Sequence, residues 1–420
     1  MSEPNIKLVP KLRFPEFWDT GEWKKKLIED FFDVGSSKRV LQEYWTTQGV
    51  PFYRTRELVS LSKNEPFGNE IFISEELFRE ISEKYGTPTD GDFLVSGVGT
   101  LGISYQVQSK DRFYFKDGNV LWFKLKDGIV STFFKFCFEA DEIQNQILRQ
   151  ASISTVGTYT IQNAKATKFS CPPIIDEQQK IADCLSSIDE LITAQTQKIT
   201  ALKGHKKGLM QQLFPAEGET VPKRRFPEFQ DAGDWVGKTI GQIARYENGK
   251  AHEQDISEFG QYVVVNSKFI STDGEVKKYT NHRNCLAKKG DILMVLSDVP
   301  NGRAIAKCFI VDADNKYTVN QRICKLTPTQ VLSKILFYLI NRNQYFLDFD
   351  DGVKQTNLKN DDVLNCPILL PEDPIEQQKI ADCLSSIDEL ITAEIQQLAS
   401  YKTHKKGLMQ QLFPLADEVA

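Results

Sequence analysis

The sequence predicts an α+β chain built as an internal repeat, in which two mixed α/β domains are joined by two long antiparallel coiled-coil helices. Three observations predict this architecture. First, each half of the chain contains a block with the sequence RFPEF near its start and a near-identical longer segment at its end. Second, the segment at the end of each half carries the heptad pattern of a coiled coil. Third, a stretch of short β-rich runs and turns lies between the two blocks of each half. Because the repeat relates the two halves, we expect a pseudo-twofold arrangement.

The repeat is defined by two segments that recur without change. Residues 177–194, EQQKIADCLSSIDELITA, are repeated at 376–393, and residues 205–215, HKKGLMQQLFP, are repeated at 404–414. A recent duplication alone would spread sequence differences evenly along both halves, but they are concentrated between these segments. We infer that the identical segments bind the same partner at two sites, whereas the divergent stretches bind two different targets.

The divergent stretches nevertheless share landmarks in the same order. The matched pairs are 9–17 (VPKLRFPEF) with 221–229 (VPKRRFPEF), 91–94 (GDFL) with 290–293 (GDIL), and 119–125 with 320–326. These landmarks predict a domain at each repeat, followed by its helix. The expected segments are a first domain at 1–170, a central helix at 171–215, a second domain at 216–368 and a C-terminal helix at 369–420.

Each repeated helix segment carries apolar residues at steps of four and three, which is typical of a coiled-coil seam. Asp176 and Asp373 mark the expected helix starts, Glu376 is placed to reach back to the cap, and Pro215 and Pro414 mark the ends. The predicted seam consists of Ile181, Leu185, Ile188, Ile192, Ile199, Leu202, Leu209 and Leu213 in the first copy, and of Ile380, Leu384, Ile387, Ile391, Leu398, Tyr401, Leu408 and Leu412 in the second.

Polar residues also occupy seam positions, and we expect them to fix the register of pairing: Gln195, Lys206, Glu394 and Lys405. Since the chain must return between the two helices, intramolecular antiparallel pairing is expected. Periodicity alone also allows a helix pair that dimerises two chains. The repeated Asp189-Glu190 pair is interpreted as a solvated face or a partner contact.

Composition limits the possible functions. The formal net charge of −5 over 420 residues argues against a strongly basic nucleic-acid binder, so any DNA contact is confined to a few loops or shared with a partner. The sequence shows neither a membrane span nor a secretory signal, which predicts a cytoplasmic protein. The eight cysteines form no CxxC pair and are expected to be reduced and mostly buried, without a disulfide framework or a zinc site.

Candidate DNA contacts stand in polar loops of the two domains. Arg, Asn and Gln side chains can form paired hydrogen bonds with guanine or adenine edges in the major groove, and Lys contacts phosphate. The candidates are Arg54, Arg56, Lys268, Lys288, Lys289, Arg303, Gln321 and Arg322. For any one of them, an ordinary solvated surface position is the more frequent alternative.

The motifs of several catalytic classes are missing. Gly237-Lys238-Thr239 imitates the end of a phosphate-binding P-loop, but Ala232 stands where that loop requires its first glycine. The chain also lacks an HExxH motif and an NPPY-type tetrapeptide. We therefore expect a recognition subunit with no catalytic residues, metal ligands or cofactor of its own.

Two divergent domains separated by near-identical helices, with EQQKIADCLSSIDELI and GLMQQLFP in each copy, resemble the specificity subunit of type I restriction-modification systems. The resemblance covers essentially the whole chain. It implies that each domain is a target-recognition domain reading one half of a bipartite site in double-stranded DNA. It further implies that the helices set the spacing and dock two methyltransferase subunits, and that two ATP-dependent translocating restriction subunits complete the complex. S-adenosylmethionine, ATP and magnesium would then belong to those partners.

Two other functional classes stay open at this point. A coiled-coil scaffold joining two protein-binding modules would bind its partners without any site-specific methylation following. A nuclease in its own right would show metal-dependent cleavage by the purified chain, although the missing motifs weigh against this class.

Overall fold

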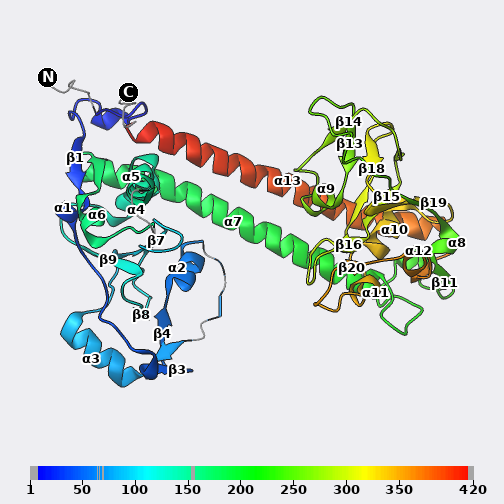
Figure 1. Ribbon diagram of the computed structural model, residues 1–420, viewed down its shortest axis with the longest axis horizontal. Coiled ribbons are helices and arrows are strands. Elements are labelled where there is room, and N and C mark those ends of the chain that lie inside the picture. The colour runs from blue at the N-terminus through cyan, green and yellow to red at the C-terminus, as the bar shows by residue number, and fades with distance from the viewer. Residues whose placement is uncertain (1–7, 64, 66, 69–70, 153–156, 415–420) are drawn as a thin grey trace. The chain divides into compact units, whose positions relative to one another are not determined.

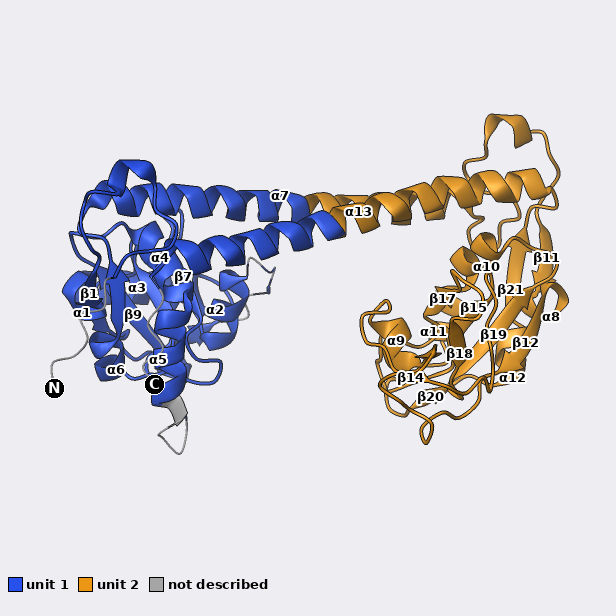
Figure 2. Cartoon of the chain, turned by 90° about the horizontal axis from the view of Figure 1, so that it is seen from above, with its two compact units in different colours: residues 1–196, 396–420 blue, residues 197–395 orange. Residues whose placement is uncertain are grey.

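The computed structural model describes residues 8–63, 65, 67–68, 71–152 and 157–414 (Figure 1). The chain forms two compact units (Figure 2). The first unit comprises residues 1–196 and 396–420, and the second comprises residues 197–395. Each unit therefore combines one β-rich module with one end of each long helix, and the predicted α+β class is confirmed.

The first module, residues 8–171, is built around a four-stranded antiparallel sheet in the order β2-β9-β6-β7. A second sheet has the order β3-β5-β4-β8, in which β4 and β8 are parallel. The elements are η1 (Pro15–Phe17), β1 (Lys24–Leu27), α1 (Ile28–Phe31), β2 (Phe32–Gly35), η2 (Gln42–Tyr44), β3 (Trp45–Thr46), β4 (Val50–Tyr53), α2 (Thr55–Ser62), β5 (Phe72–Ile73), α3 (Glu75–Tyr85), β6 (Phe93–Ser96), β7 (Ser104–Gln106), β8 (Tyr114–Phe115), β9 (Val120–Leu125), α4 (Ser131–Glu139), α5 (Asp141–Ser152), α6 (Ile161–Ala166) and β10 (Lys168–Cys171).

The second module, residues 222–370, repeats the topology of the main sheet and the parallel pair of the second sheet despite its different sequence. Its main sheet has the order β12-β19-β15-β17, and its second sheet, β14-β13-β18, contains the parallel pair β13 and β18. The elements are η3 (Pro227–Phe229), β11 (Val236–Thr239), α8 (Ile240–Ile243), β12 (Ala244–Asn248), β13 (Tyr262–Val265), α9 (Ser267–Ser271), β14 (Tyr279–Thr280), β15 (Ile292–Val295), β16 (Ser297–Asp298), β17 (Cys308–Ile310), β18 (Tyr317–Val319), β19 (Ile323–Pro328), α10 (Ser333–Ile340), α11 (Gln344–Leu347), β20 (Thr356–Asn357), α12 (Asn360–Leu364) and β21 (Pro367–Leu370).

Strand register corrects one of the predicted correspondences between the modules. Phe93 of β6 pairs with Phe123, and its counterpart in the GD motif, Ile292 of β15, pairs with Leu326. Hence β9 corresponds to residues 323–328, and the predicted match of 119–125 with 320–326 is wrong by two residues. A shift of two leaves every side chain on the same face of a strand, so the apolar pattern could not detect the error.

The two long helices are α7 (Ile175–Leu213) and α13 (Pro374–Leu412), each followed by proline as predicted. Asp373 caps α13 by accepting the backbone N–H of Ile375 at 2.8 Å, which confirms that helix start. Asp176 lies inside the first turn of α7, where its charge favours the helix dipole, so the predicted cap there is wrong. Glu376 does not reach back to the cap, because a buried arginine takes its carboxylate.

Within the second unit the helices run antiparallel. Lys198 pairs with Glu394 and Lys206 pairs with Asp388, so residue numbers rise along α7 as they fall along α13. In the first unit, Lys405 pairs with Asp189. The intramolecular antiparallel pairing predicted from the sequence is thus confirmed.

Two further predictions can be compared with the fold. All eight cysteines lie in the described part of the chain as free thiols, and six of them are buried, as predicted. Burial raises the pKa of Cys171 to about 12, so this thiol is not a nucleophile at neutral pH. Among the described residues, no helix combines the length and the apolar character needed to cross a membrane.

Candidate functional site

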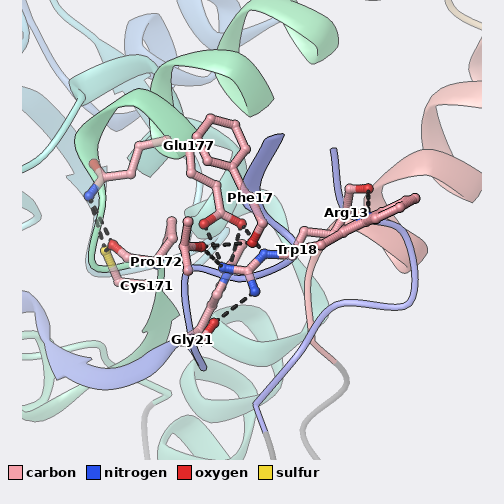
Figure 3. Close-up of polar contacts among 10 residues, drawn as sticks. Arg13, Phe17, Trp18, Gly21, Cys171, Pro172 and Glu177 are labelled. Atoms are coloured by element: carbon pink, nitrogen blue, oxygen red, sulfur yellow. Dashed lines mark hydrogen bonds and ion pairs between the residues drawn. The ribbon is translucent and has the colours of Figure 1, made fainter. Parts of the chain in front are cut away.

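The repeated RFPEF and EQQ motifs meet each other within each half of the chain. In the first unit, the Arg13 guanidinium points at Glu177 at the start of α7 (Figure 3). Its Nε donates to Glu177 Oε1 and its Nη2 donates to Oε2, both at 2.8 Å, and Trp23 Nε1 donates to Oε1 at 3.0 Å. Both charged side chains are buried. This contact fixes the start of the helix to the N-terminal segment of the module.

The second half contains the equivalent joint between Arg225 and Glu376. Nε and Nη2 of Arg225 donate to the two carboxylate oxygens of Glu376, both at 2.7 Å. Here the equivalent tryptophan, Trp235, is buried, and its Nε1 has no hydrogen-bond partner within the described residues. Part of the sequence identity between the repeats is therefore explained by contacts inside the chain, which the inference of a shared partner had not considered.

The glutamine after each of these glutamates also has a structural role. Gln178 accepts the backbone N–H of Val130 at 2.9 Å, at the start of α4. Gln377 accepts the backbone N–H of Leu332 at 3.1 Å, at the start of α10. Each long helix is thereby tied to a short apolar helix of its own module.

All sixteen predicted seam residues are buried or half-buried. At the helix ends they do more than pair the two helices. Ile181, Leu185 and Leu412 belong to the aromatic-rich core of the first module, and Ile380 and Leu384 belong to the core of the second. The helix ends are therefore part of the module cores.

The polar seam residues Lys206 and Lys405 form equivalent ion pairs across the helices. Lys206 Nζ lies 2.6 and 2.7 Å from the carboxylate oxygens of Asp388, to which the Tyr338 hydroxyl also donates at 2.8 Å. Lys405 Nζ lies 2.8 Å from Asp189 and 3.1 Å from Glu139. Burial opposes the charge of Lys405, yet the two carboxylates raise the pKa of its ammonium group above the ordinary value. Asp189 therefore forms an ion pair between the two helices, and its interpretation as part of a solvated face was wrong.

We expect Asp388→Asn to lower the free energy of unfolding by about 1 kcal/mol, because the pair is partly exposed and solvent screens it. Urea denaturation checks this value. The matched control is Glu389→Gln, which removes the same charge from the neighbouring exposed position. Equal effects of the two substitutions would show that the pair contributes nothing beyond net charge.

In the second module, four of the predicted DNA contacts come together at one end. The parallel strands β13 and β18 finish at the same edge, and Lys268 follows the first while Gln321 and Arg322 follow the second. The backbone N–H of Leu296, after β15, donates to the carbonyl of Arg322 at 3.0 Å. The loop that carries Arg303 therefore leaves from the same end. We call this end of a module its strand-end edge.

The loop bearing Arg303 is held closed by a carboxylate that the sequence analysis missed. Asp298 accepts the backbone N–H groups of Val299, Ala304 and Ile305 at 2.9, 2.6 and 3.1 Å. A Cβ at Gly302 would lie 2.1 Å from an Asp298 carboxylate oxygen, so a larger residue there would displace the carboxylate that holds the loop. Asp followed four residues later by Gly was the available sequence signal.

Lys288 and Lys289 lie elsewhere. They precede β15 and stand at the end opposite the strand-end edge, and both are exposed. The backbone N–H of Lys288 donates to the buried Asp291, and that of Lys289 donates to Asp314. The structure thus separates these two candidates from the other four in the same module.

In the first module, Arg54 and Arg56 follow β4, whose parallel partner is β8. They therefore occupy the equivalent strand-end edge. Both guanidinium groups contact the buried Glu57 carboxylate, with Nη2 to Oε1 distances of 2.7 and 3.0 Å. Burial favours the neutral acid, but hydrogen bonds from Arg54 outweigh it and hold the pKa of Glu57 below its ordinary value. An ionised Glu57 orients both arginines.

Comparison with known proteins gives a family match and two similar sequences. The family model described as "Type I restriction modification DNA specificity domain" matches residues 20–203 and 232–400, which is more than half of the chain. The MjaVIII specificity subunit of Methanocaldococcus jannaschii, a type I restriction enzyme component, is 26% identical over 98% of this chain and 95% of its own length. A Haemophilus influenzae protein assigned provisionally as such a subunit, S.HindORF215P, is 29% identical over 41% of this chain, a match that spans 42% of that relative.

Among solved structures, the type I restriction-modification S subunit from M. genitalium has a similar fold. Its TM-score is 0.61 at 16% sequence identity, and the match covers 98% of this chain and 100% of the other. At this level of identity the likeness concerns the fold alone.

Proposed function

This chain belongs to the family of type I restriction-modification DNA specificity subunits, and from that premise we propose that each module reads one half of a bipartite site in double-stranded DNA. One observation carries the proposal. The two modules share the topology of their main sheet, yet they expose different polar side chains at equivalent edges, such as Arg56 in the first and Lys268 in the second. A common scaffold with different contact residues suits recognition of two different base sequences.

We further propose that the helices dock two identical methyltransferase subunits and set the distance between half-sites. Leu191 and Leu390, at equivalent positions of the repeat, are 49% and 43% exposed, which suits two equivalent partner contacts. S-adenosylmethionine, ATP and magnesium are assigned to the partner subunits. In the described part of the chain, no cluster of His, Cys, Asp and Glu has the composition of a metal site.

The experiment that tests this proposal is genome-wide mapping of adenine methylation in cells expressing the cognate methyltransferase subunit with and without this chain. The expected result is a two-part motif with a fixed gap that appears only when the chain is present. Absence of any such motif would contradict the proposal, and it would favour a scaffold that joins protein partners without directing methylation.

A further inference from the structure

We infer that DNA meets each module at its strand-end edge only, and that this edge includes further basic residues, after β2 and β8 in the first module and after β12 in the second, that the sequence did not single out. The inference rests on the proposed function and deepens it, because it assigns the DNA-contacting surface. In the first module the added residues are Lys38, Arg39 and Lys116, and in the second module the added residue is Lys250.

The segment after β2 is pinned to the strand-end edge of the first module. Ser36 Oγ donates to the carbonyl of Val120 at 3.0 Å, and Ser37 Oγ donates to that of Phe115 at 2.8 Å. The backbone N–H of Lys38 donates to the Tyr114 hydroxyl at 2.9 Å. These contacts place Lys38 and the next residue, Arg39, beside the end of β8, and both side chains are exposed.

The end of β8 lies directly beside the end of β4. Tyr53 and Phe115 are register partners, and the backbone N–H of Lys116 donates to the carbonyl of Tyr53 at 2.8 Å. Arg54 follows Tyr53 directly, and Arg56 lies two residues further along the chain. Basic residues from three separate chain segments therefore gather at one end of the first module.

The second module repeats this construction. After β12, the backbone N–H of Gly249 donates to the carbonyl of Ile323, and that of Lys250 donates to the carbonyl of Val319, both at 2.9 Å. The approach is so close that a Cβ at Gly249 would lie 2.0 Å from the Asn320 carbonyl oxygen. The exposed Lys250 is thus fixed beside the segment that carries Gln321 and Arg322.

Several carboxylates near these edges are already engaged within the protein. Glu57 is bound by Arg54 and Arg56, and Asp298 accepts three backbone N–H groups. Glu253 Oε1 accepts from the Asn320 and Gln321 side-chain amides at 3.1 and 3.3 Å. Ammonium and guanidinium groups on such an edge attract phosphate, and this local charge is compatible with the negative net charge of the chain.

The opposite end of the second module has a different character. There, acidic and basic groups alternate: Lys316 pairs with Asp312 at 3.2 Å, and Asp314 accepts the backbone N–H of Lys289. Lys288 and Lys289 therefore share their surroundings with carboxylates. We assign DNA contact to the strand-end edge and exclude Lys288 and Lys289 from it.

The test compares charge-matched double variants in the complex with the methyltransferase subunit. Arg303→Ala with Arg322→Ala removes two positive charges from the strand-end edge, and Lys288→Ala with Lys289→Ala removes two from the opposite end. Binding to duplexes containing the mapped motif is measured over a range of salt concentrations. We expect the first variant to bind about 10- to 100-fold more weakly, as loss of direct base contacts predicts, and the control to bind like the parent.

Lys38→Ala with Arg39→Ala tests the added residues in the first module. We expect weaker binding to all sequences. The slope of the logarithm of the binding constant against the logarithm of the salt concentration should become shallower by about one for each lost phosphate contact. Arg322→Lys keeps the charge but loses the paired hydrogen bonds, so it should bind DNA while methylating a relaxed set of sequences at one half-site. This conservative variant distinguishes base reading from a folding defect.

The outcomes separate the inference from the proposed function. If the parent complex methylates a two-part motif but the strand-end variants behave like the parent, or if the Lys288/Lys289 control loses binding equally, the inference is overturned and the proposed function stands. If the parent complex directs no motif at all, the proposed function itself fails. Loss of binding confined to the strand-end variants supports the inference.

Discussion

Replacement of Glu177 by alanine is expected to lower the free energy of unfolding of the first unit by about 3–5 kcal/mol. The substitution leaves the buried Arg13 guanidinium without its carboxylate and also removes the acceptor of the Trp23 indole N–H. An unpaired charge excluded from water is one of the most costly defects in a protein interior. Urea denaturation, with hydrogen exchange to report on each unit separately, measures the change.

The duplication provides an internal comparison for this result. Glu376→Ala breaks the equivalent pair with Arg225, but Trp235 loses nothing, because its Nε1 has no partner there among the described residues. The second unit should therefore lose less stability than the first. Lys11→Ala and Arg224→Ala are the controls, since they remove exposed charges beside each buried arginine. If the glutamate variants and these controls had equal effects, the buried joints would not be stabilising the units.

Insertion of four residues after Ala194 and four after Ala393 is expected to widen the gap between the two methylated half-sites. At 1.5 Å per residue the helices lengthen by about 6 Å, which corresponds to between one and two base-pair steps of about 3.4 Å. The pair Lys206–Asp388 lies on one side of both insertions and the pair Lys405–Asp189 lies on the other, so each keeps its register. Mapping of the methylated motif measures the gap.

The control for this experiment is the same insertion in only one helix. That change shifts the two helices against each other by about 6 Å. The single-insertion variant should therefore be less stable and direct less methylation, without a wider gap between the half-sites. An unchanged gap in the double-insertion variant would refute the idea that helix length sets the spacing. A changed gap in the double variant alone would support it.

The sequence by itself determined the features that depend on local pattern. Heptad spacing predicted both long helices and their apolar seam from Ile181 to Leu213 and from Ile380 to Leu412, because a helix places residues three and four apart on one face. The direct repeat predicted the duplicated fold and antiparallel pairing. The family resemblance also followed from these repeated motifs.

Only the tertiary structure decided which distant segments meet. Arg13 contacts Glu177 across 164 residues, and no local pattern relates the two. Likewise, Lys38, Arg56 and Lys116 reach one edge of the first module because three strands end there. In the second module, Lys288 stands at the end opposite the strand-end edge although its residue type suits DNA equally well. The side-chain pattern of a strand repeats every two residues, so the pattern determines neither the register of the strand nor which strands lie beside it. Long-range pairing determines both, and therefore also which residues form the surface that a partner contacts.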